Sequence, residues 1–283
     1  MMDLLTQQDV LAHQAEVPWP SLRQVEQDLL LCRAMASIFN DGFLHEQVAM
    51  RGGTLLHKVY LAPPSRFSED IDLVVFGDRP EDHICKALRR VLAEVLGSPK
   101  ASAWNTISLA VPNTLRPSRI LRMTYAVPPV IEPGPALQIV VEANVTERTS
   151  HSPIAKLPFQ FPFRRDSVSM SINGYDIHEM LGTKMRALFQ RRRGRDLFDL
   201  YWALEHGTPP VDPAAVVDSF LYYLSQEGAQ VVREEFITIL DSHVSDRGFR
   251  SDTDHLLRAG VQYDPYRAGE CVRTKLLSRL PDG

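Results

Sequence analysis

Two acidic residues at alternate positions of an apolar segment are the first candidates for chemistry in this sequence. Asp70 and Asp72 open the segment DIDLVVFG, whose β-branched residues and final glycine predict a strand. Residues i and i+2 of a strand point to the same face, so the two carboxylates project together, about 6.6 Å apart along the strand. Their mutual repulsion favours a divalent cation between them, and Mg²⁺ prefers carboxylate oxygens.

A glycine pair precedes this strand in RGGTLL. Gly52 and Gly53 allow the backbone to approach a phosphate closely, and the N–H groups at the start of the following helix bind anions. The Thr54 hydroxyl adds a donor. An Asp-x-Asp pair or a Gly-Gly turn alone is usually a solvated strand or an ordinary turn. Asp72, however, stands in an apolar strand, where an unpaired carboxylate is costly. We therefore expect a triphosphate cradle folded against a metal-binding pair of acids.

A third carboxylate would complete a two-metal site. The segment ALQIVVEANV predicts another strand, and Glu142 is its only acid. Asn144 shares the face of Glu142. The alternative for Glu142 is a surface residue near the end of a strand.

A second group of candidates lies in LGTKMRALFQRRRGRDLFDLY. Lys184 lies between the members of an apolar helical stripe, from which its ammonium could reach a phosphate as a point charge. Asp196 and Asp199 lie on one face of the next helix. Asp199 is surrounded by apolar residues and could orient Lys184 or an arginine, whereas Asp196 could simply cap its helix. Between them is the strongest local positive charge of the chain, suited to a polynucleotide backbone or to a solvated turn: Arg191, Arg192, Arg193 and Arg195.

The surrounding elements divide the chain into a mixed α/β half and a helical half. We expect helices at 19–39, with Ser21 and Gln24 as a capping box and Gly42 as the stop, at 54–61 and at 79–97. The expected strands are 105–111, 119–127 and 136–146. The proline-rich segments VPPVIEPGP and KLPFQFPF predict loops, and Asn173-Gly174 predicts a hairpin turn. Residues from about 178 onward are helical in pattern. We thus expect a nucleotide-binding α/β domain at 1–170 and a helical domain at 171–283 that contributes Lys184 and Asp199 to a shared cleft.

Composition sets broad limits on function. The chain has 283 residues, 44% hydrophobic and 23% charged, with a formal charge of −4. This is typical of a globular protein and does not by itself indicate nucleic-acid binding. Three widely spaced cysteines argue against a disulfide framework and favour the cytoplasm. The N-terminal segment is unlike a signal peptide, and no apolar run is long enough to predict a membrane span. Zinc-protease, serine-hydrolase and Walker-type motifs are absent from the sequence.

Four motifs together resemble a known family. RGGTLL, FSEDIDLVVF, VVEANVTER and LGTKMRALFQRRRGRDLFDLYWAL resemble, in order and spacing over residues 50–202, the AbiEii/AbiGii toxin family of nucleotidyltransferases, which includes the MenT toxins. The resemblance implies an α+β fold: a polymerase β-like nucleotidyltransferase core, a mixed sheet flanked by helices, with a helical C-terminal region. It also implies Mg²⁺-dependent (or Mn²⁺-dependent) transfer of a nucleotide from an NTP to the 3′ end of tRNA, which blocks translation.

The resemblance also assigns roles to single residues. Asp70, Asp72 and Glu142 become catalytic metal ligands, and Gly52, Gly53 and Thr54 contact the NTP. The family lysine corresponds to Lys184, and the C-terminal acid to Asp199 or Asp196. The four arginines would hold tRNA.

Ser68 matches the hydroxyl position of the Ser/Thr-x-Asp-x-Asp motif. The resemblance implies that it contacts the NTP and is a site of regulatory phosphorylation. The implied partner is an antitoxin, either a winged-helix AbiEi-like protein or a kinase-like one, with no membrane involved. Two alternatives remain: the same transfer to a small-molecule or protein acceptor, or a catalytically silent binding module of this fold. The intact glycines, aspartates and Lys184 disfavour the silent module.

Overall fold

The computed structural model describes residues 5–111 and 114–282, with side chains for all of these except residues 104–118. The chain forms two compact units. The first comprises Met1–Ile107 and Ser118–Tyr175, and the second comprises Ser108–Pro117 and Asp176–Gly283.

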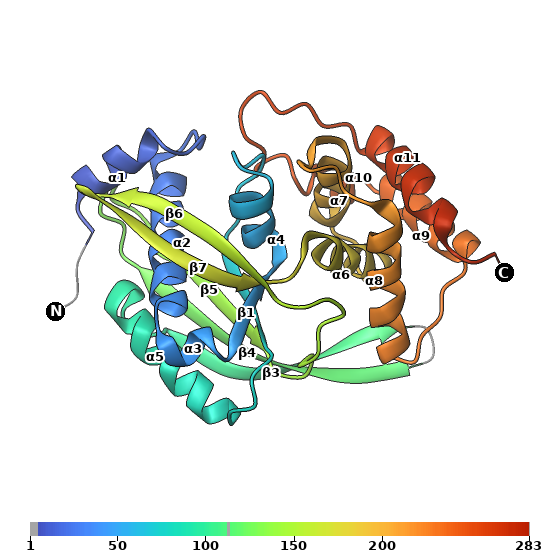
Figure 1. Cartoon of the computed structure of the whole chain (residues 1–283). Coiled ribbons are helices and arrows are strands. Elements are labelled where there is room, and N and C mark those ends of the chain that lie inside the picture. Colours follow the sequence, from blue (N-terminus) through green and yellow to red (C-terminus); the bar gives the residue numbers. More distant parts are fainter. Residues whose placement is uncertain (1–4, 112–113, 283) are drawn as a thin grey trace. The chain divides into compact units, whose positions relative to one another are not determined.

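A mixed seven-stranded sheet has the order β3-β4-β5-β2-β1-β7-β6 (Figure 1). At its centre, β2 runs antiparallel to β1 and parallel to β5, and β4 runs antiparallel to β5. The sheet therefore brings together segments that are far apart in the sequence. The strands are β1 (Val48–Arg51), β2 (Asp70–Val75), β3 (Ala101–Val111), β4 (Thr114–Val127), β5 (Leu137–Asn144), β6 (Ala155–Phe163) and β7 (Asp166–Gly174).

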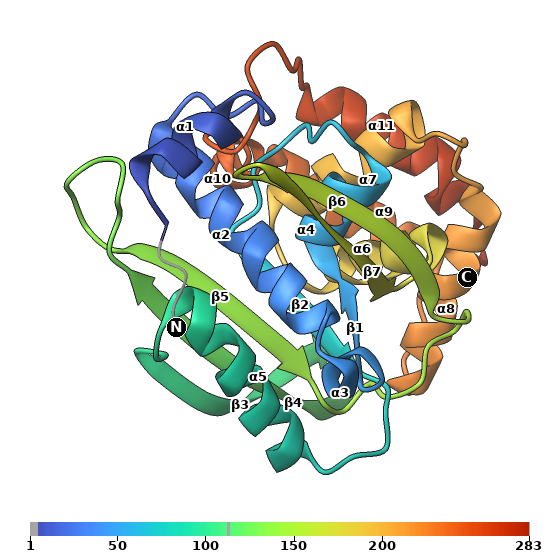
Figure 2. The ribbon, with the colours of Figure 1, turned by 60° about the vertical axis from the view of Figure 1, so that its left-hand side comes forward.

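Two long helices cover one face of this sheet. Helix α2 (Leu22–Phe39) packs against β2, β5 and β7, and α5 (Glu81–Leu96) packs beside α2 (Figure 2). Two short helices, α1 (Gln7–Gln14) and α3 (Gly42–His45), pack against α2. Alternate residues of the central strand, Ile71, Leu73 and Val75, are buried. On the other face of β2, Asp70 and Asp72 are partly exposed, whereas Val74 is buried.

The glycine pair begins a short helix that is α-helical in its first half and π-helical in its second half. Helix α4 (Gly52–Leu55) continues directly into a π-helical turn, η1 (Leu56–Tyr60), in which the Leu61 N–H donates to the Leu56 carbonyl at 2.9 Å. The helix predicted at 54–61 is therefore present, with a wider turn in its second half. Such π turns are frequent at functional sites.

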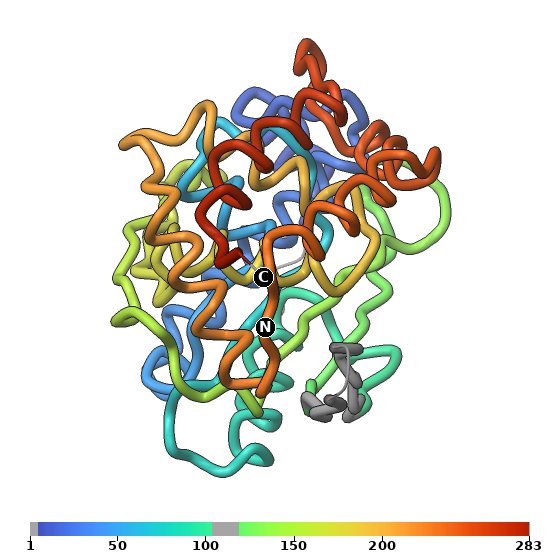
Figure 3. Tube along the Cα trace, turned by 90° about the vertical axis from the view of Figure 1, so that its right-hand side faces the viewer, coloured from blue at the N-terminus to red at the C-terminus, as the bar shows by residue number. Residues whose placement is uncertain are grey.

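From Asp176 onward, the second unit is built from helices (Figure 3). Helix α6 packs against α7, α8 and α9, and α11 packs against α7 and α9. Aromatic rings of Phe189, Phe220 and Phe236 meet in its core. No helix within the described ranges is long and apolar enough to span a bilayer. The helices are α6 (Ile177–Gln190), α7 (Gly194–His206), α8 (Pro213–Gln226), α9 (Arg233–Ser245), α10 (Arg247–Ser251), α11 (Pro265–Lys275) and the 3₁₀ turn η2 (Leu277–Arg279).

The segment KLPFQFPF and the Asn173-Gly174 pair differ from the prediction. KLPFQFPF belongs to β6, which pairs antiparallel with β7 from Ala155↔Gly174 to Phe163↔Asp166. Prolines are tolerated there because β6 is an edge strand. Asn173-Gly174 lies inside β7, where the Asn173 side chain donates to the His45 carbonyl. The predicted loop and hairpin were both wrong, since position in the sheet outweighs local turn preference.

The predicted capping box of α2 is also wrong. Ser21 is the N-cap residue, but its side chain makes no capping hydrogen bond. The backbone geometry therefore follows the prediction while the predicted side-chain contact is missing.

Candidate active site

The Gly-Gly turn and the acidic strand lie against each other in the first unit. Arg51, the last residue of β1, is the Cα partner of Asp72 in β2, so the turn begins beside that aspartate. The fully buried Thr54 hydroxyl donates a hydrogen bond to the Asp70 carbonyl. Thr54 thus fixes the start of the acidic strand, and its proposed contact with a phosphate stays a prediction.

The two glycines are required by close approach. Gly52 has φ +81°, and a β-carbon there would lie 2.0 Å from Asp72 Oδ2. A β-carbon on Gly53 would lie 2.4 Å from Arg66 Nη2. The turn is consequently flanked by a carboxylate on one residue and by a guanidinium on the next.

The three candidate acids share one face of the sheet. Asp70 and Asp72 are partly exposed, whereas the intervening Ile71 is buried. Glu142 in β5 is the Cα partner of Asp72, and the two strands are parallel, so both side chains leave the sheet on the same side. Neighbouring strands lie about 4.8 Å apart. Glu142 also forms an ion pair with Arg122 of β4.

The aspartate pair suits a divalent cation. Carboxylate oxygens are the ligands that Mg²⁺ prefers, and the partial exposure of Asp70 and Asp72 lets a hydrated ion reach them. Glu142 does not complete a compact triad. Among the described residues, only His13, Asp28 and Cys32 place three candidate ligand atoms within 4.8 Å of one another.

A positively charged side chain already lies against that buried trio. Lys58 Nζ lies 2.5 Å from Asp28 Oδ2 and 3.5 Å from Cys32 Sγ. Burial opposes ionisation of Asp28, but Lys58 and His13 outweigh it and hold the pKa of that carboxyl well below its ordinary value. Burial raises the pKa of the Cys32 thiol to about 12, and the Lys58 ammonium beside this thiol disfavours a second cation there. The cluster instead ties the π turn to α2.

Ser68 is enclosed within the first unit. It is 6% exposed, and its hydroxyl accepts a hydrogen bond of 3.4 Å from Nη1 of the buried Arg66. The same nitrogen donates to the Phe67 carbonyl at 3.0 Å. A kinase could reach Ser68 only if this segment opened, and the proposed NTP contact and phosphorylation of Ser68 stay predictions.

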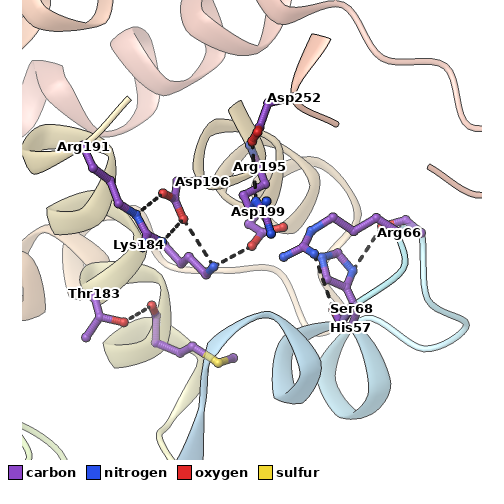
Figure 4. Close-up of polar contacts among 12 residues, drawn as sticks. His57, Arg66, Ser68, Thr183, Lys184, Arg191, Arg195, Asp196, Asp199 and Asp252 are labelled. Carbon is purple, nitrogen blue, oxygen red and sulfur yellow. Dashed lines mark hydrogen bonds and ion pairs between the residues drawn. The ribbon is translucent and has the colours of Figure 1, made fainter. Parts of the chain in front are cut away.

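In the second unit, Lys184 of α6 lies between two aspartates of α7 (Figure 4). Its Nζ is 2.9 Å from Asp199 Oδ2 and 3.3 Å from Asp196 Oδ1, and both aspartates are fully buried. Asp196 also accepts hydrogen bonds of 2.8 and 3.1 Å from Arg191. Burial opposes ionisation of Asp196, but Lys184 and Arg191 outweigh it and lower its pKa.

The two aspartates therefore share the lysine. Asp199 contacts Lys184 across the helix pair, as its apolar surroundings predicted. Asp196 does not cap α7, because Arg193 is the N-cap residue. Asp196 is instead buried and contacts two cationic side chains, Lys184 and Arg191.

Each arginine of the basic run has an acidic neighbour in the second unit. The Arg192 and Arg193 side chains are 57% and 60% exposed, and their nearest carboxylate contacts are long. They keep the freedom to meet a polyanion, whereas Arg191, although its side chain is 56% exposed, is held by two hydrogen bonds to the buried Asp196. The pairs are Arg191–Asp196 at 2.8 Å, Arg192–Asp246 at 3.6 Å, Arg193–Asp252 at 3.8 Å and Arg195–Asp252 at 3.5 Å.

Sequence reasoning missed three arginines beside the acidic strand. Arg51 is the first residue of RGGT and Arg66 stands two residues before SEDID, and this proximity was the available signal. Burial opposes the charge on Arg51, but Glu147, Tyr175 and Asp72 outweigh it and raise its pKa. Arg122 had no local signal, since only strand pairing brings it to Glu142.

Comparison with solved structures agrees with this geometry. The fold matches MenT4, a nucleotidyltransferase toxin from Mycobacterium tuberculosis H37Rv, with a TM-score of 0.56 and 16% sequence identity over 98% of this chain and 91% of that one. The predicted nucleotidyltransferase fold with a helical C-terminal region is thereby confirmed. No curated protein sequence matches the chain. The family described as "Nucleotidyl transferase AbiEii toxin, Type IV TA system" matches residues 33–272, and the chain belongs to this family.

Proposed function

We propose that this protein is a Mg²⁺-dependent nucleotidyltransferase that transfers a nucleotide from an NTP to the 3′ end of tRNA and thereby blocks translation. The observation that carries the proposal is the contact of the Gly52 turn with the Asp72 carboxylate. A turn able to take a phosphate and a strand able to hold a cation are parts of one site, as an NTP–metal complex requires.

The first-unit residues divide the work of binding the nucleotide. Asp70 and Asp72 hold the cation, and Gly52 and Gly53 present the backbone to the β and γ phosphates. When bound, Mg²⁺ supplies positive charge to the triphosphate and orients it. The acceptor hydroxyl oxygen forms a bond to the α phosphorus, the bond to the β-phosphate oxygen breaks, and pyrophosphate leaves. Glu142 is the candidate base for the hydroxyl proton.

The second-unit residues neutralise negative charge on the phosphates and bind the acceptor. Lys184 neutralises charge that develops on the phosphates, and Asp199 and Asp196 fix its ammonium. Arg192 and Arg193 hold the acceptor backbone, because their side chains are exposed and their carboxylate contacts, at 3.6 and 3.8 Å, are the longest of the run. In this assignment Arg191 and Arg195 mainly contact carboxylates of the second unit, Asp196 and Asp252, and contribute less to tRNA binding.

Control by an antitoxin follows from the family. A type IV toxin–antitoxin family implies an antitoxin partner, and we propose that it acts in the cytoplasm, where tRNA is found. A phosphate on Ser68 would bring nearly two negative charges next to the Asp70 strand. Since Arg66 contacts Ser68, that phosphate would also draw the guanidinium away from Gly53. Both effects would weaken binding of the NTP–metal complex.

One observation keeps a second candidate open. The arginines of the basic run are each near a carboxylate, which reduces the field available for a polynucleotide. Transfer to a small-molecule or protein acceptor uses the same first-unit chemistry and needs no such field. A catalytically silent module would need neither.

A labelling experiment separates these functions. The protein is incubated with each labelled NTP, Mg²⁺ and total tRNA, beside Asp70→Asn and a matched control, Asp78→Asn, whose carboxylate is 93% exposed. Label on tRNA that is lost only in Asp70→Asn supports the proposal. Label on protein or small molecules moves the assignment to the second candidate. Absence of transfer with any NTP, in a folded protein, refutes both.

A further inference from the structure

Four charged residues form a row across four neighbouring strands. Arg51 of β1 is paired with Asp72 of β2, Asp72 with Glu142 of β5, and Glu142 with Arg122 of β4. Residues paired across strands project to the same face. The row therefore reads positive, negative, negative, positive, with the two acids of the candidate site in its middle.

The outer arginine is engaged with Glu142. Arg122 donates from Nη1 to Glu142 Oε1, and the two side chains are 47% and 22% exposed. The ligand atoms of Asp70, Asp72 and Glu142 do not all lie within 4.8 Å of one another, in contrast to the buried trio around Asp28. The third acid of the site thus has a guanidinium partner that is itself open to a ligand.

We propose that Arg122 takes the place of a second metal ion: the site binds one divalent cation, on Asp70 and Asp72, and Arg122 on Glu142 supplies the other positive charge to the substrate phosphates. This inference rests on the proposed function. A guanidinium suits the task, because it stays protonated and can bind a carboxylate and a phosphate through different N–H groups.

The strand register makes this charge permanent. The Cα atom of Arg122 is fixed opposite that of Glu142, so its side chain cannot leave this face of the sheet. A second divalent cation on Glu142 would have to displace the guanidinium and would then lie beside its charge. Arg122 therefore both neutralises Glu142 and excludes a competing ion.

Counting bound Mn²⁺ tests the inference without any turnover. Electron paramagnetic resonance titration with a non-hydrolysable NTP analogue is expected to give one Mn²⁺ per wild-type chain. Arg122→Ala should bind two, and Arg122→Ala with Glu142→Gln should return to one. The control is Arg119→Ala, in the same strand, whose guanidinium pairs with Glu81 at 2.7 Å; it should still bind one.

The outcomes separate this inference from the proposed function. Two Mn²⁺ on the wild-type chain, or one on Arg122→Ala, would overturn the role of Arg122 and leave the proposed function standing. No Mn²⁺ and no nucleotide on the wild-type chain would overturn the proposed function itself. In transfer assays, Arg122→Ala should lose about 100-fold at low Mg²⁺, typical for one electrostatic contact, and recover most of it at high Mn²⁺ only when Glu142 is present.

Discussion

Substitution of Gly52 by alanine should impair nucleotide transfer much more than it lowers the stability of the fold. The added β-carbon would lie 2.0 Å from Asp72 Oδ2, and ordinary contact begins at 3.4 Å, so the carboxylate oxygen must retreat by about 1.4 Å. Rotation of the side chain alone does not relieve the collision, because the Asp72 β-carbon would itself be only 2.9 Å away. The displacement must therefore move the strand or the turn.

The expected loss follows from this distance. A misplacement of about 1 Å at reacting groups costs on the order of 100-fold in rate. In addition, a non-glycine residue at φ +81° costs about 1–2 kcal/mol of stability. Gly52→Ala should thus lose about 100-fold in nucleotide transfer and at least tenfold in Mn²⁺ affinity, while it unfolds at only slightly lower urea concentration.

A second glycine provides the matched control. Gly260 has φ +83°, and a β-carbon there would meet nothing within 4 Å. Gly260→Ala carries the same backbone strain without the collision, so it should lose similar stability and keep its activity. If Gly52→Ala transferred nucleotide and bound Mn²⁺ as well as Gly260→Ala does, the turn and Asp72 would not act as one site.

Three further predictions concern the other clusters. Asp28→Asn leaves the Lys58 ammonium buried without its counter-charge and should lower the free energy of unfolding by about 3–5 kcal/mol in urea titrations; a loss under about 1 kcal/mol would contradict this role. Because the folded state depresses the pKa of Asp28, its contribution is complete above the ordinary carboxyl pKa of about 4 and is lost as pH falls below it, so the wild-type advantage over Asp28→Asn should stay constant at higher pH and shrink as the pH falls from about 4 to about 2. Asp199→Asn should reduce kcat about tenfold, because the Lys184 ammonium loses a contact that fixes its position; an unchanged kcat would show that this contact does not serve nucleotide transfer. Arg192→Ala combined with Arg193→Ala should reduce the salt slope of tRNA binding by about 2, and an unchanged slope would place the tRNA elsewhere.

The central strand and the glycine turn were predictable because their signals are local. Alternation placed Asp70 and Asp72 on one face of β2, and Gly52 marked a backbone position that only glycine fits. The structure adds the reason for that glycine, which is the Asp72 carboxylate itself. Local patterns predicted that the turn folds against the acidic strand, but not which atoms meet there.

Strand register was beyond the reach of the sequence. Arg122 meets Glu142 only because β4 pairs with β5, and no spacing in the sequence encodes that partner. The same limit explains the error at Asn173-Gly174, where a strong turn signal lies inside β7. A turn dipeptide reports what the backbone can adopt, whereas the neighbouring strands decide what it does adopt.

Burial distinguishes the acids that can bind a metal from those that position a side chain. Asp196 and Asp199 are fully buried, and each lies within 3.3 Å of the Lys184 ammonium. A hydrated cation would have to displace that lysine and shed its water in the interior, which is unfavourable. Asp70 and Asp72 keep part of their surface open to water, so a hydrated ion can reach them. The C-terminal acids therefore hold Lys184, and we propose the pair on β2 as the site of the divalent cation.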